Sequence, residues 1–330
     1  MTNDSLQAEL QAQLSGQYEL ERELPRGGMS RVFVATENAL RRRIVIKVLA
    51  PELAASLSAE RFKREIALAA RLQHPHIVPL LSAGLAGTHL YYTMPYVDGE
   101  SLRERLNRER PMAFADIATI IEHVAGALSY AHEEGIVHRD IKPENVMFFH
   151  GEAVVLDFGI GKALISASTT ETEAEVLRIT QVGMSLGTPT YVAPEQGAGD
   201  QSLDHRADLY ALGVVAYEMI TGHPPFTGRS PQAVIEAHAN KVPEPLAVRR
   251  PDVPKHLAAI VMRTLEKRPS NRPSTGEEIA KAVSVPVAPR HSGGGPVVES
   301  LANAPRWVPW AIAGFSTSVA IVMAVLYVTR

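Results

Sequence analysis

Two short stretches contain the polar and charged residues that most clearly indicate what reaction this chain could support. HRDIKPEN, residues 138–145, is followed by DFG at residues 157–159, and both interrupt a part of the sequence whose apolar runs are otherwise mostly helical. Together they place the carboxylates of Asp140 and Asp157, a lysine and an asparagine on neighbouring loops. Phosphoryl transfer needs such a set, because it uses metal ions, a base for the incoming hydroxyl and a cation beside the transferred group. The oxygens of Asn145 and Asp157 suit Mg²⁺, which prefers hard ligands.

The apolar pattern changes along the chain. Runs rich in β-branched residues at 18–37, 41–50 and 88–97 predict antiparallel strands. Residues 58–73 have apolar side chains at helical spacing, and from residue 114 onward the apolar runs are mainly helical. We therefore expect a small sheet-rich lobe followed by a larger helical lobe.

The motifs resemble those of the eukaryotic-like protein kinases, specifically the bacterial serine/threonine branch. The resemblance covers residues 18 to 283, and its six spaced motifs occur in the family's order, which makes a chance match rare. It implies an α+β, two-lobed protein kinase fold, with a sheet-rich N-lobe over residues 18–97 and a helical C-lobe over 98–283. Residues 1–17 are expected to be a polar N-terminal segment.

The resemblance implies a role for each polar residue of the two loops. Asp140 corresponds to the catalytic base, and Lys142 to the lysine beside the γ-phosphate, which marks the serine/threonine class. Asn145 and Asp157 correspond to the metal ligands. ATP and Mg²⁺ are therefore the expected cofactors.

Other motif positions imply supporting roles. Lys47 in VIKVL resembles the strand lysine that grips the α- and β-phosphates, with Glu65 as its ion-pair partner. Asp208 resembles the buried aspartate that braces the catalytic loop. Glu195 of the APE motif is expected to pair with Arg272.

The resemblance also places residues around the nucleotide. The predicted nucleotide-binding residues are Leu24, Gly27, Gly28, Ser30, Val32, Lys47, Met94, Pro95, Val97 and Glu100. Within this set Val32 would cap the adenine and Met94 would be the gatekeeper. The carbonyl of Pro95 and the backbone of Val97 would face the adenine, and Glu100 would reach the ribose.

The glycine loop departs from the family pattern. Pro25 stands at the first glycine and Ser30 at the third, whereas Gly27, where the backbone comes closest to phosphate, is kept. Proline fixes φ near −65° and removes one N–H. We expect weaker nucleotide binding rather than lost catalysis.

Two alternatives compete with an active protein kinase. A pseudokinase scaffold is supported by Pro25, but inactive relatives usually lose Lys47, Asp140 or Asp157, and all three are present. A small-molecule phosphotransferase is disfavoured because GTPTYVAPEQ, residues 187–196, resembles a platform for protein substrates.

The segment between the DFG and APE motifs suggests regulation. Arg139, directly before the predicted base, implies a basic pocket for a phosphate on this segment. Thr188 matches the substrate-platform threonine, and Thr180 lies eight residues earlier. Thr180 is therefore the predicted autophosphorylation site, with Ser185 as the second candidate.

The C-terminus predicts a membrane anchor. After a linker at residues 284–306, rich in proline, glycine and serine, Val308 to Val328 contains no charged residue. A helix of that length spans about 30 Å, the hydrocarbon thickness of a bilayer. We expect one transmembrane helix over residues 307–328 in the inner membrane, with the kinase domain in the cytoplasm, where ATP is. No cleavable signal peptide and no extracytoplasmic domain are expected.

Composition limits which kinds of partner and covalent cross-link the chain can have. The chain has no cysteine, which excludes a disulfide framework, and its net charge of −3 gives no indication of nucleic-acid binding. The expected partners are ATP, protein substrates with serine or threonine hydroxyls, the lipid bilayer, and a second copy of the chain for autophosphorylation in trans.

Overall fold

The computed structural model describes residues 3–24, 30–49, 62, 66–158, 189–200 and 202–284. The chain divides into two compact units, Met1–Pro286 and Val287–Arg330, and all described residues belong to the first. Within these described residues, no helix combines the length and the hydropathy of a membrane span. The predicted transmembrane segment, residues 307–328, lies outside them.

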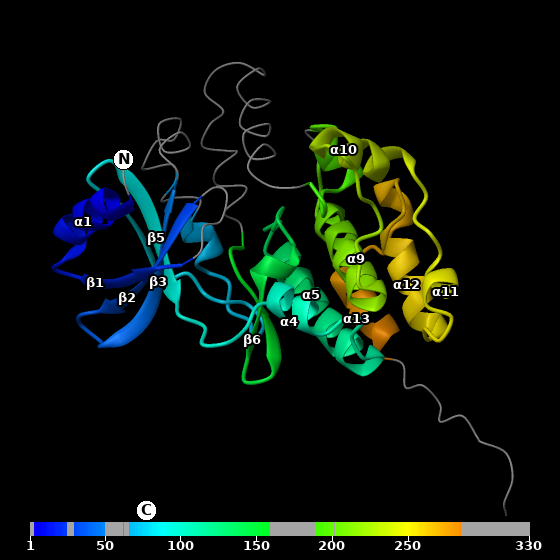
Figure 1. Cartoon of the computed structure of the whole chain (residues 1–330), viewed down its shortest axis with the longest axis horizontal. Coiled ribbons are helices and arrows are strands. Elements are labelled where there is room, and N and C mark those ends of the chain that lie inside the picture. Colours follow the sequence, from blue (N-terminus) through cyan, green and yellow to red (C-terminus); the bar gives the residue numbers. More distant parts are fainter. Residues whose placement is uncertain are drawn as a thin grey trace, which may run out of the picture. The chain divides into compact units, whose positions relative to one another are not determined.

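The N-lobe is built on a five-stranded antiparallel sheet of order β1-β2-β3-β5-β4 (Figure 1). Its elements are α1 (Asn3–Leu14), β1 (Tyr18–Glu23), β2 (Ser30–Glu37), β3 (Arg42–Leu49), β4 (Ser82–Ala86) and β5 (His89–Pro95). The strands predicted from the sequence are confirmed. Phe62 and residues 66–69 are helical, within the stretch where a helix was predicted.

The two faces of this sheet bury different side chains. On β3, Ile44 and Ile46 belong to a buried cluster on the outer face, and Val45 and Leu49 belong to one on the inner face. This alternation follows from the two-residue period of a strand. Lys47 has the parity of Val45 and Leu49, so the strand period directs it to the inner face.

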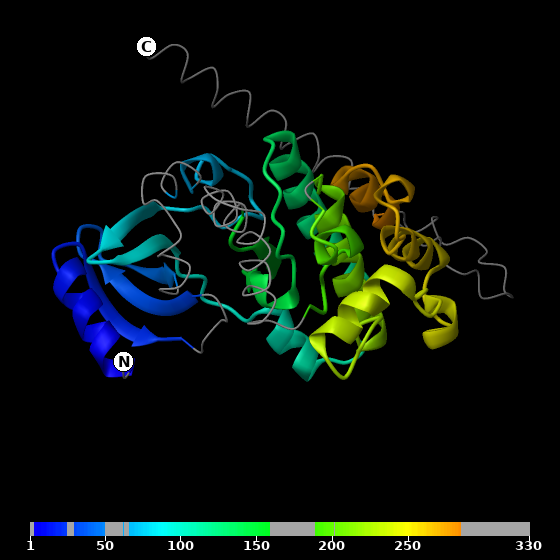
Figure 2. The ribbon, with the colours of Figure 1, turned by 90° about the horizontal axis from the view of Figure 1, so that it is seen from above.

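Helix α1 covers the outer face of the sheet, as Figure 2 shows. Leu6, Leu10 and Leu14, spaced four residues apart, are buried in the outer cluster. The Gln11 side chain donates to the Tyr18 carbonyl at 3.2 Å and accepts from the Leu20 N–H at 2.7 Å. The stretch predicted only as a polar segment is thus largely a docked helix, because its leucines form one stripe among polar neighbours.

The C-lobe is mainly helical. It contains α4 (Leu102–Arg108), α5 (Phe114–Glu133), η1 (Pro143–Asn145), β6 (Val146–Phe149), β7 (Glu152–Val155), α8 (Pro194–Gly197), α9 (Arg206–Thr221), α10 (Pro231–Asn240), α11 (Leu246–Arg249), α12 (Lys255–Thr264), η2 (Pro269–Asn271) and α13 (Gly276–Val283). Strands β6 and β7 form a separate antiparallel hairpin.

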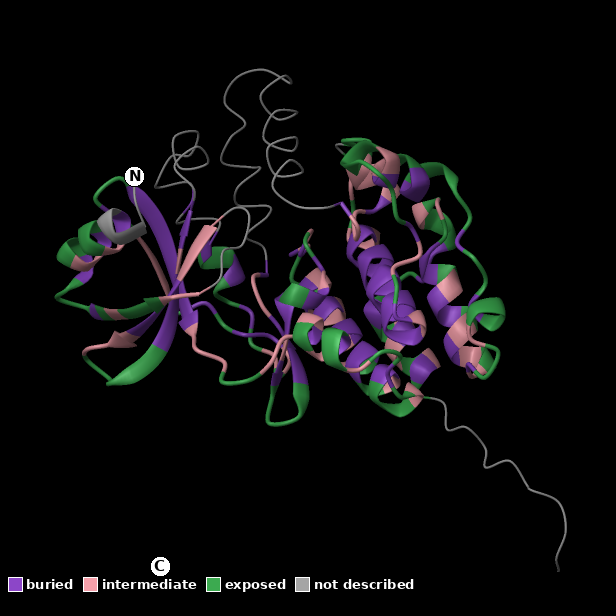
Figure 3. Ribbon diagram, in the orientation of Figure 1, coloured by how far each residue is buried: buried purple, intermediate pink, exposed green. Residues whose placement is uncertain are grey.

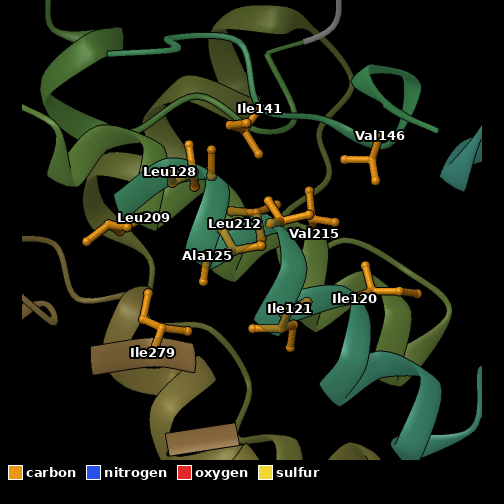
Figure 4. Packing of buried hydrophobic residues seen from close by; sticks show 14 of the residues in the cluster. Ile120, Ile121, Ala125, Leu128, Ile141, Val146, Leu209, Leu212, Val215 and Ile279 are labelled. Carbon is orange, nitrogen blue, oxygen red and sulfur yellow. The ribbon is translucent and has the colours of Figure 1, made fainter. Parts of the chain in front are cut away.

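The C-lobe core centres on α5 and α9. Figure 3 shows α9 buried along nearly its whole length, and Figure 4 shows its residues Leu209, Leu212 and Val215 packed among side chains of α5. Helix α12 approaches α9 so closely that a Cβ on Gly213 would lie 2.0 Å from Thr264 Oγ1. A helix buried on all sides provides a rigid base, and its N-terminal turn carries Asp208 to the loop that precedes β6.

Candidate active site

The loop before β6 is held by one buried carboxylate. Asp208 accepts hydrogen bonds from the backbone N–H groups of His138 and Arg139, both at 2.7 Å, and lies 2.8 Å from His132 Nε2. Burial alone would raise the pKa of Asp208, but the bond and charge of His132, the charge of His138 and the Arg139 N–H bond together lower it. The carboxylate therefore stays ionised and fixes the loop backbone.

The backbone of the site is strained at two points, one in this loop and one just after β7. Arg139 has φ 69° and Asp157 has φ 65°, conformations that non-glycine residues seldom adopt. His138 is fully buried and bridges the two stretches, with Nε2 2.7 Å from the Leu156 carbonyl and Nδ1 accepting from the Asp140 N–H at 3.2 Å. Such strain persists only where surrounding contacts determine the conformation.

Three of the predicted catalytic residues form one hydrogen-bonded cluster. Lys142 Nζ lies 2.6 Å from Asp140 Oδ2, and Asn145 Nδ2 donates to the same oxygen at 3.1 Å and to the Asp140 carbonyl at 2.7 Å. Among the described residues no donor reaches Asp140 Oδ1, and the side chain is 57% exposed. One carboxylate oxygen is thus oriented by its neighbours while the other is free to accept a proton.

Asp157 lies beside the N-lobe sheet. Its Oδ2 forms an ion pair with Lys47 Nζ, and its Oδ1 accepts a hydrogen bond from the Tyr92 hydroxyl at 3.1 Å. Burial, the charge of Asp157 and the hydrogen bond to it raise the pKa of Tyr92 well above its usual value. Glu65, the predicted partner of Lys47, lies outside the described residues, so the partner that the structure gives Lys47 is Asp157.

The residues predicted to surround the nucleotide lie along the inner face of the sheet and the connection that follows it. Val32 pairs with Lys47 across β2 and β3, and the Leu24 N–H donates to the Val32 carbonyl at 2.8 Å. Met94 is buried in the inner cluster, against which Val32 and Val97 pack half-buried.

Other members of the predicted nucleotide set take different positions. Pro95 ends β5, and Ser30 begins β2. Glu100, predicted to reach the ribose, lies 2.6 Å from Arg108 Nη2 on α4. Gly27, Gly28 and Pro25 of the glycine loop lie outside the described residues, as do Thr180, Ser185 and Thr188.

A buried ion pair fixes the chain after residue 188. Arg272 donates to both oxygens of Glu195, at 2.6 and 2.7 Å, which is the predicted pairing. The Arg272 side chain has no exposure, and that of Glu195 is 10% exposed. The neighbouring Gln196 amide donates to the Arg139 carbonyl at 2.9 Å, so this segment also contacts the loop that carries Asp140.

A second charged cluster links α4 to the same segment. Arg103 donates to Glu144 and to Glu218, each at 2.7 Å, and to the hydroxyl of Tyr191, which in turn donates to Glu218. Burial alone would lower the pKa of Arg103, but hydrogen bonds to the two carboxylates raise it. Glu144 belongs to the HRDIKPEN stretch, so this cluster attaches the candidate site to α9.

The comparisons with known proteins agree with this arrangement. A family model described as a protein kinase domain matches residues 18–284. The chain belongs to the protein kinase family. It is 41% identical over 272 residues to the serine/threonine-protein kinase PknB of Mycolicibacterium smegmatis and 40% identical to PknB of Mycobacterium tuberculosis, with 81% of this chain and 42% of each relative covered.

A more distant relative is the serine/threonine-protein kinase pkn2 of Myxococcus xanthus, which is 36% identical over 278 residues, or 82% of this chain and 32% of that protein. The matches thus span less than half the length of these curated relatives. They confirm the resemblance to the bacterial serine/threonine branch, and the part that matches is the kinase domain.

The donor set of the kinase domain fits the Mg²⁺ that the family implies. The Nδ2 group of Asn145 is engaged with Asp140, an orientation that leaves Oδ1 as the acceptor of this amide. Asp157 adds a carboxylate. Mg²⁺ is commonly held by one or two such protein oxygens together with phosphate oxygens and water.

Sequence reasoning missed several residues of the kinase domain. Tyr92 holds Asp157 through a bond that spans 65 positions of the chain, and Arg103 joins Glu144 of the HRDIKPEN stretch to Glu218 on α9 through bonds that span 41 and 115 positions. Met147 and Leu156 pack half-buried against the inner cluster, as Val32 of β2 does. Their only sequence signal is apolar parity on the short strand β6 and just after β7, which is too weak to separate them from ordinary core residues.

Proposed function

We propose that this chain is an active serine/threonine protein kinase that transfers the γ-phosphoryl group of ATP to hydroxyls of protein serine and threonine residues. The observation that carries the proposal is the bonded cluster of Asp140, Lys142 and Asn145, together with the ion pair of Lys47 and Asp157. The family and the named relatives support the same chemistry. A pseudokinase would have no need of this complete set.

In the proposed reaction the substrate hydroxyl oxygen forms a bond to the γ-phosphorus. The bond between that phosphorus and the β–γ bridging oxygen breaks, ADP leaves, and the hydroxyl proton passes to the Asp140 carboxylate. Lys142 steadies the transferred group, and Lys47 holds the α- and β-phosphates. Mg²⁺, when held by Asn145 and Asp157, supplies positive charge against the phosphate oxygens.

The activity is tested with the full-length chain in detergent, radiolabelled ATP, Mg²⁺ and a generic basic protein as acceptor. We expect label on the acceptor and on the chain itself, with phosphoserine and phosphothreonine recovered after acid hydrolysis. Nucleotide binding without any transfer would instead identify a scaffold. Label on a small metabolite but on no protein would identify a small-molecule phosphotransferase.

We further propose that the kinase activates itself by phosphorylation in trans. The Arg139 side chain is mostly buried, burial lowers its pKa, and its Nε has no hydrogen-bond partner among the described residues. A buried N–H without a bonded partner is costly, so a phosphate near Arg139 would relieve this cost through charge-assisted hydrogen bonds. This supports the reading of Arg139 as part of a phosphate pocket.

Thr180→Ala is expected to lower the activity about tenfold or more, the factor that corresponds to one hydrogen bond between charged groups. Transfer rates to a generic protein and mass spectrometry of the active enzyme measure this. Thr172→Ala is the matched control, because Thr172 lies between two glutamates where an added phosphate meets like charge. If Thr180 is unmodified in the active enzyme, or its alanine variant is fully active, Ser185 becomes the site to test.

We propose that residues 307–328 anchor the kinase in the inner membrane, with the kinase domain in the cytoplasm. The support is the uncharged run from Val308 to Val328. Full-length protein is expected to sediment with membranes and to resist alkaline carbonate, whereas a chain ending at residue 290 should stay in the supernatant. Release of the full-length protein by carbonate would exclude the anchor.

A further inference from the structure

The two oxygens of Asp157 are held by different donors. Lys47 takes Oδ2, and the hydroxyl of Tyr92 donates to Oδ1 at 3.1 Å. Tyr92 is 3% exposed, and Asp157 is the partner that its hydroxyl has among the described residues. The ring of Tyr92 fills the apolar inner cluster, a task that phenylalanine would perform equally well. The hydroxyl therefore needs a separate explanation.

The sheet register explains why Tyr92 reaches Asp157. Tyr92 on β5 lies directly opposite Lys47 on β3, so the two side chains leave the same face of the sheet as neighbours. Tyr91, one residue earlier, belongs to the outer cluster and meets the ring of Tyr18 edge-on at 6.5 Å between ring centroids. The strand thus directs two consecutive tyrosines to opposite faces, and only one of them toward the candidate site.

The two donors differ in what else they can bind. Lys47 is the proposed ligand of the nucleotide phosphates, so a bound nucleotide competes with Asp157 for its ammonium group. Tyr92 is neutral and lies deep in the inner cluster, so its hydroxyl does not leave Asp157 for a phosphate as the Lys47 ammonium group can. When Lys47 turns to the nucleotide, the phenol remains as the donor that holds Oδ1, and Oδ2 becomes available.

We propose that Tyr92 is a positioning residue that holds the Asp157 carboxylate through Oδ1 and thereby strengthens binding of the divalent metal with the nucleotide. This inference rests on the proposed role of Asp157 as a metal ligand and extends it to a residue outside the kinase motifs. An ionised carboxylate only accepts hydrogen bonds, so the phenol is the donor and adds no charge that would repel the metal. A carboxylate held in place also loses less freedom when it binds the ion.

The experiment compares the full-length wild type with Tyr92→Phe and with Tyr91→Phe, the matched control on the opposite face. Binding of Mn²⁺ in the presence of excess ADP is followed by the electron paramagnetic resonance signal of free Mn²⁺, which needs no turnover. We expect the Kd for Mn²⁺ to rise roughly tenfold in Tyr92→Phe, the effect of losing one hydrogen bond to a charged group. In Tyr91→Phe it should stay within about twofold of wild type, since the Tyr91 side chain lies in the outer cluster, on the face of the strand opposite to Asp157.

Two further readouts separate positioning from packing. Affinity for ADP without metal should be equal in all three proteins, and in transfer assays the activity lost in Tyr92→Phe should return at high Mg²⁺, as a change in binding rather than in kcat. Wild-type Mn²⁺ affinity in Tyr92→Phe would overturn the proposal, as would a wild type that binds no Mn²⁺ with ADP. A wild type that binds Mn²⁺ and ADP but transfers no phosphate would refute the proposed activity alone.

Discussion

Asp140→Asn is expected to lower kcat by about two to four orders of magnitude, the contribution of a positioned general base. Asparagine has the same shape but cannot accept the hydroxyl proton. The loop should keep its geometry, because Asp208 binds the backbone of His138 and Arg139, and Asn145 binds the Asp140 carbonyl, all without the Asp140 carboxylate. Single-turnover transfer rates measure the chemical step. Calorimetric titration measures the nucleotide affinity, which should stay near that of the wild type.

The control for this variant is Asp116→Asn on α5. Asp116 is also a half-exposed aspartate, 49% exposed, and forms an ion pair with Arg105 at 2.8 Å. Its replacement should leave both kcat and nucleotide affinity unchanged. Near-normal turnover in Asp140→Asn would show that another group takes the proton. A parallel loss of nucleotide binding would show that the carboxylate is needed for the site to form, which the contacts of its backbone do not suggest.

The proposed catalytic cluster was predictable because most of it is local in sequence. Asp140, Lys142 and Asn145 lie within six consecutive positions, and one short 3₁₀ turn, η1, brings their side chains together. The order of the family's motifs also predicts which distant residues support the loop. The bonds from the loop backbone to Asp208, and the pair of Glu195 with Arg272, agree with that expectation.

Tyr92 and Arg103 were not predictable for the opposite reason. Each is an ordinary residue in its own segment, a tyrosine in an apolar strand and an arginine in a charged helix. Their roles arise from partners far along the chain, which the sheet register and the packing of α4 on η1 bring near. A single sequence carries no local signal for such contacts.

Helix α1 shows how composition can mislead. Its sequence is mainly polar and gives no broad apolar face, so residues 1–17 read as a polar segment. The helix depends instead on a narrow leucine stripe and on Gln11. The Gln11 amide donates to the Tyr18 carbonyl and accepts from the Leu20 N–H, both on strand β1. Tertiary contacts of this kind stabilise helices whose own amphipathicity is weak.

Arg272→Ala is expected to lower the free energy of unfolding by about 3–5 kcal/mol, the usual cost of removing one partner of a buried ion pair. All five guanidinium N–H groups of Arg272 are used: two bind Glu195, and three bind the carbonyls of Glu266, Arg206 and Lys267. Alanine would leave the Glu195 charge and three carbonyls without these donors. For a domain of this size the midpoint of thermal unfolding should fall by roughly 6–20 °C.

Two further variants determine whether this loss comes from the buried fork or from charge alone. Arg272→Lys keeps the charge but offers three donors without the planar geometry, so it should recover only part of the stability. Arg249→Ala removes an arginine from an exposed pair with Glu244 and should leave the midpoint unchanged. Full recovery in Arg272→Lys would mean that charge suffices. A midpoint in Arg272→Ala equal to that of Arg249→Ala would mean that water replaces the lost donors, and that the segment holding Glu195 and Gln196 is anchored by other contacts.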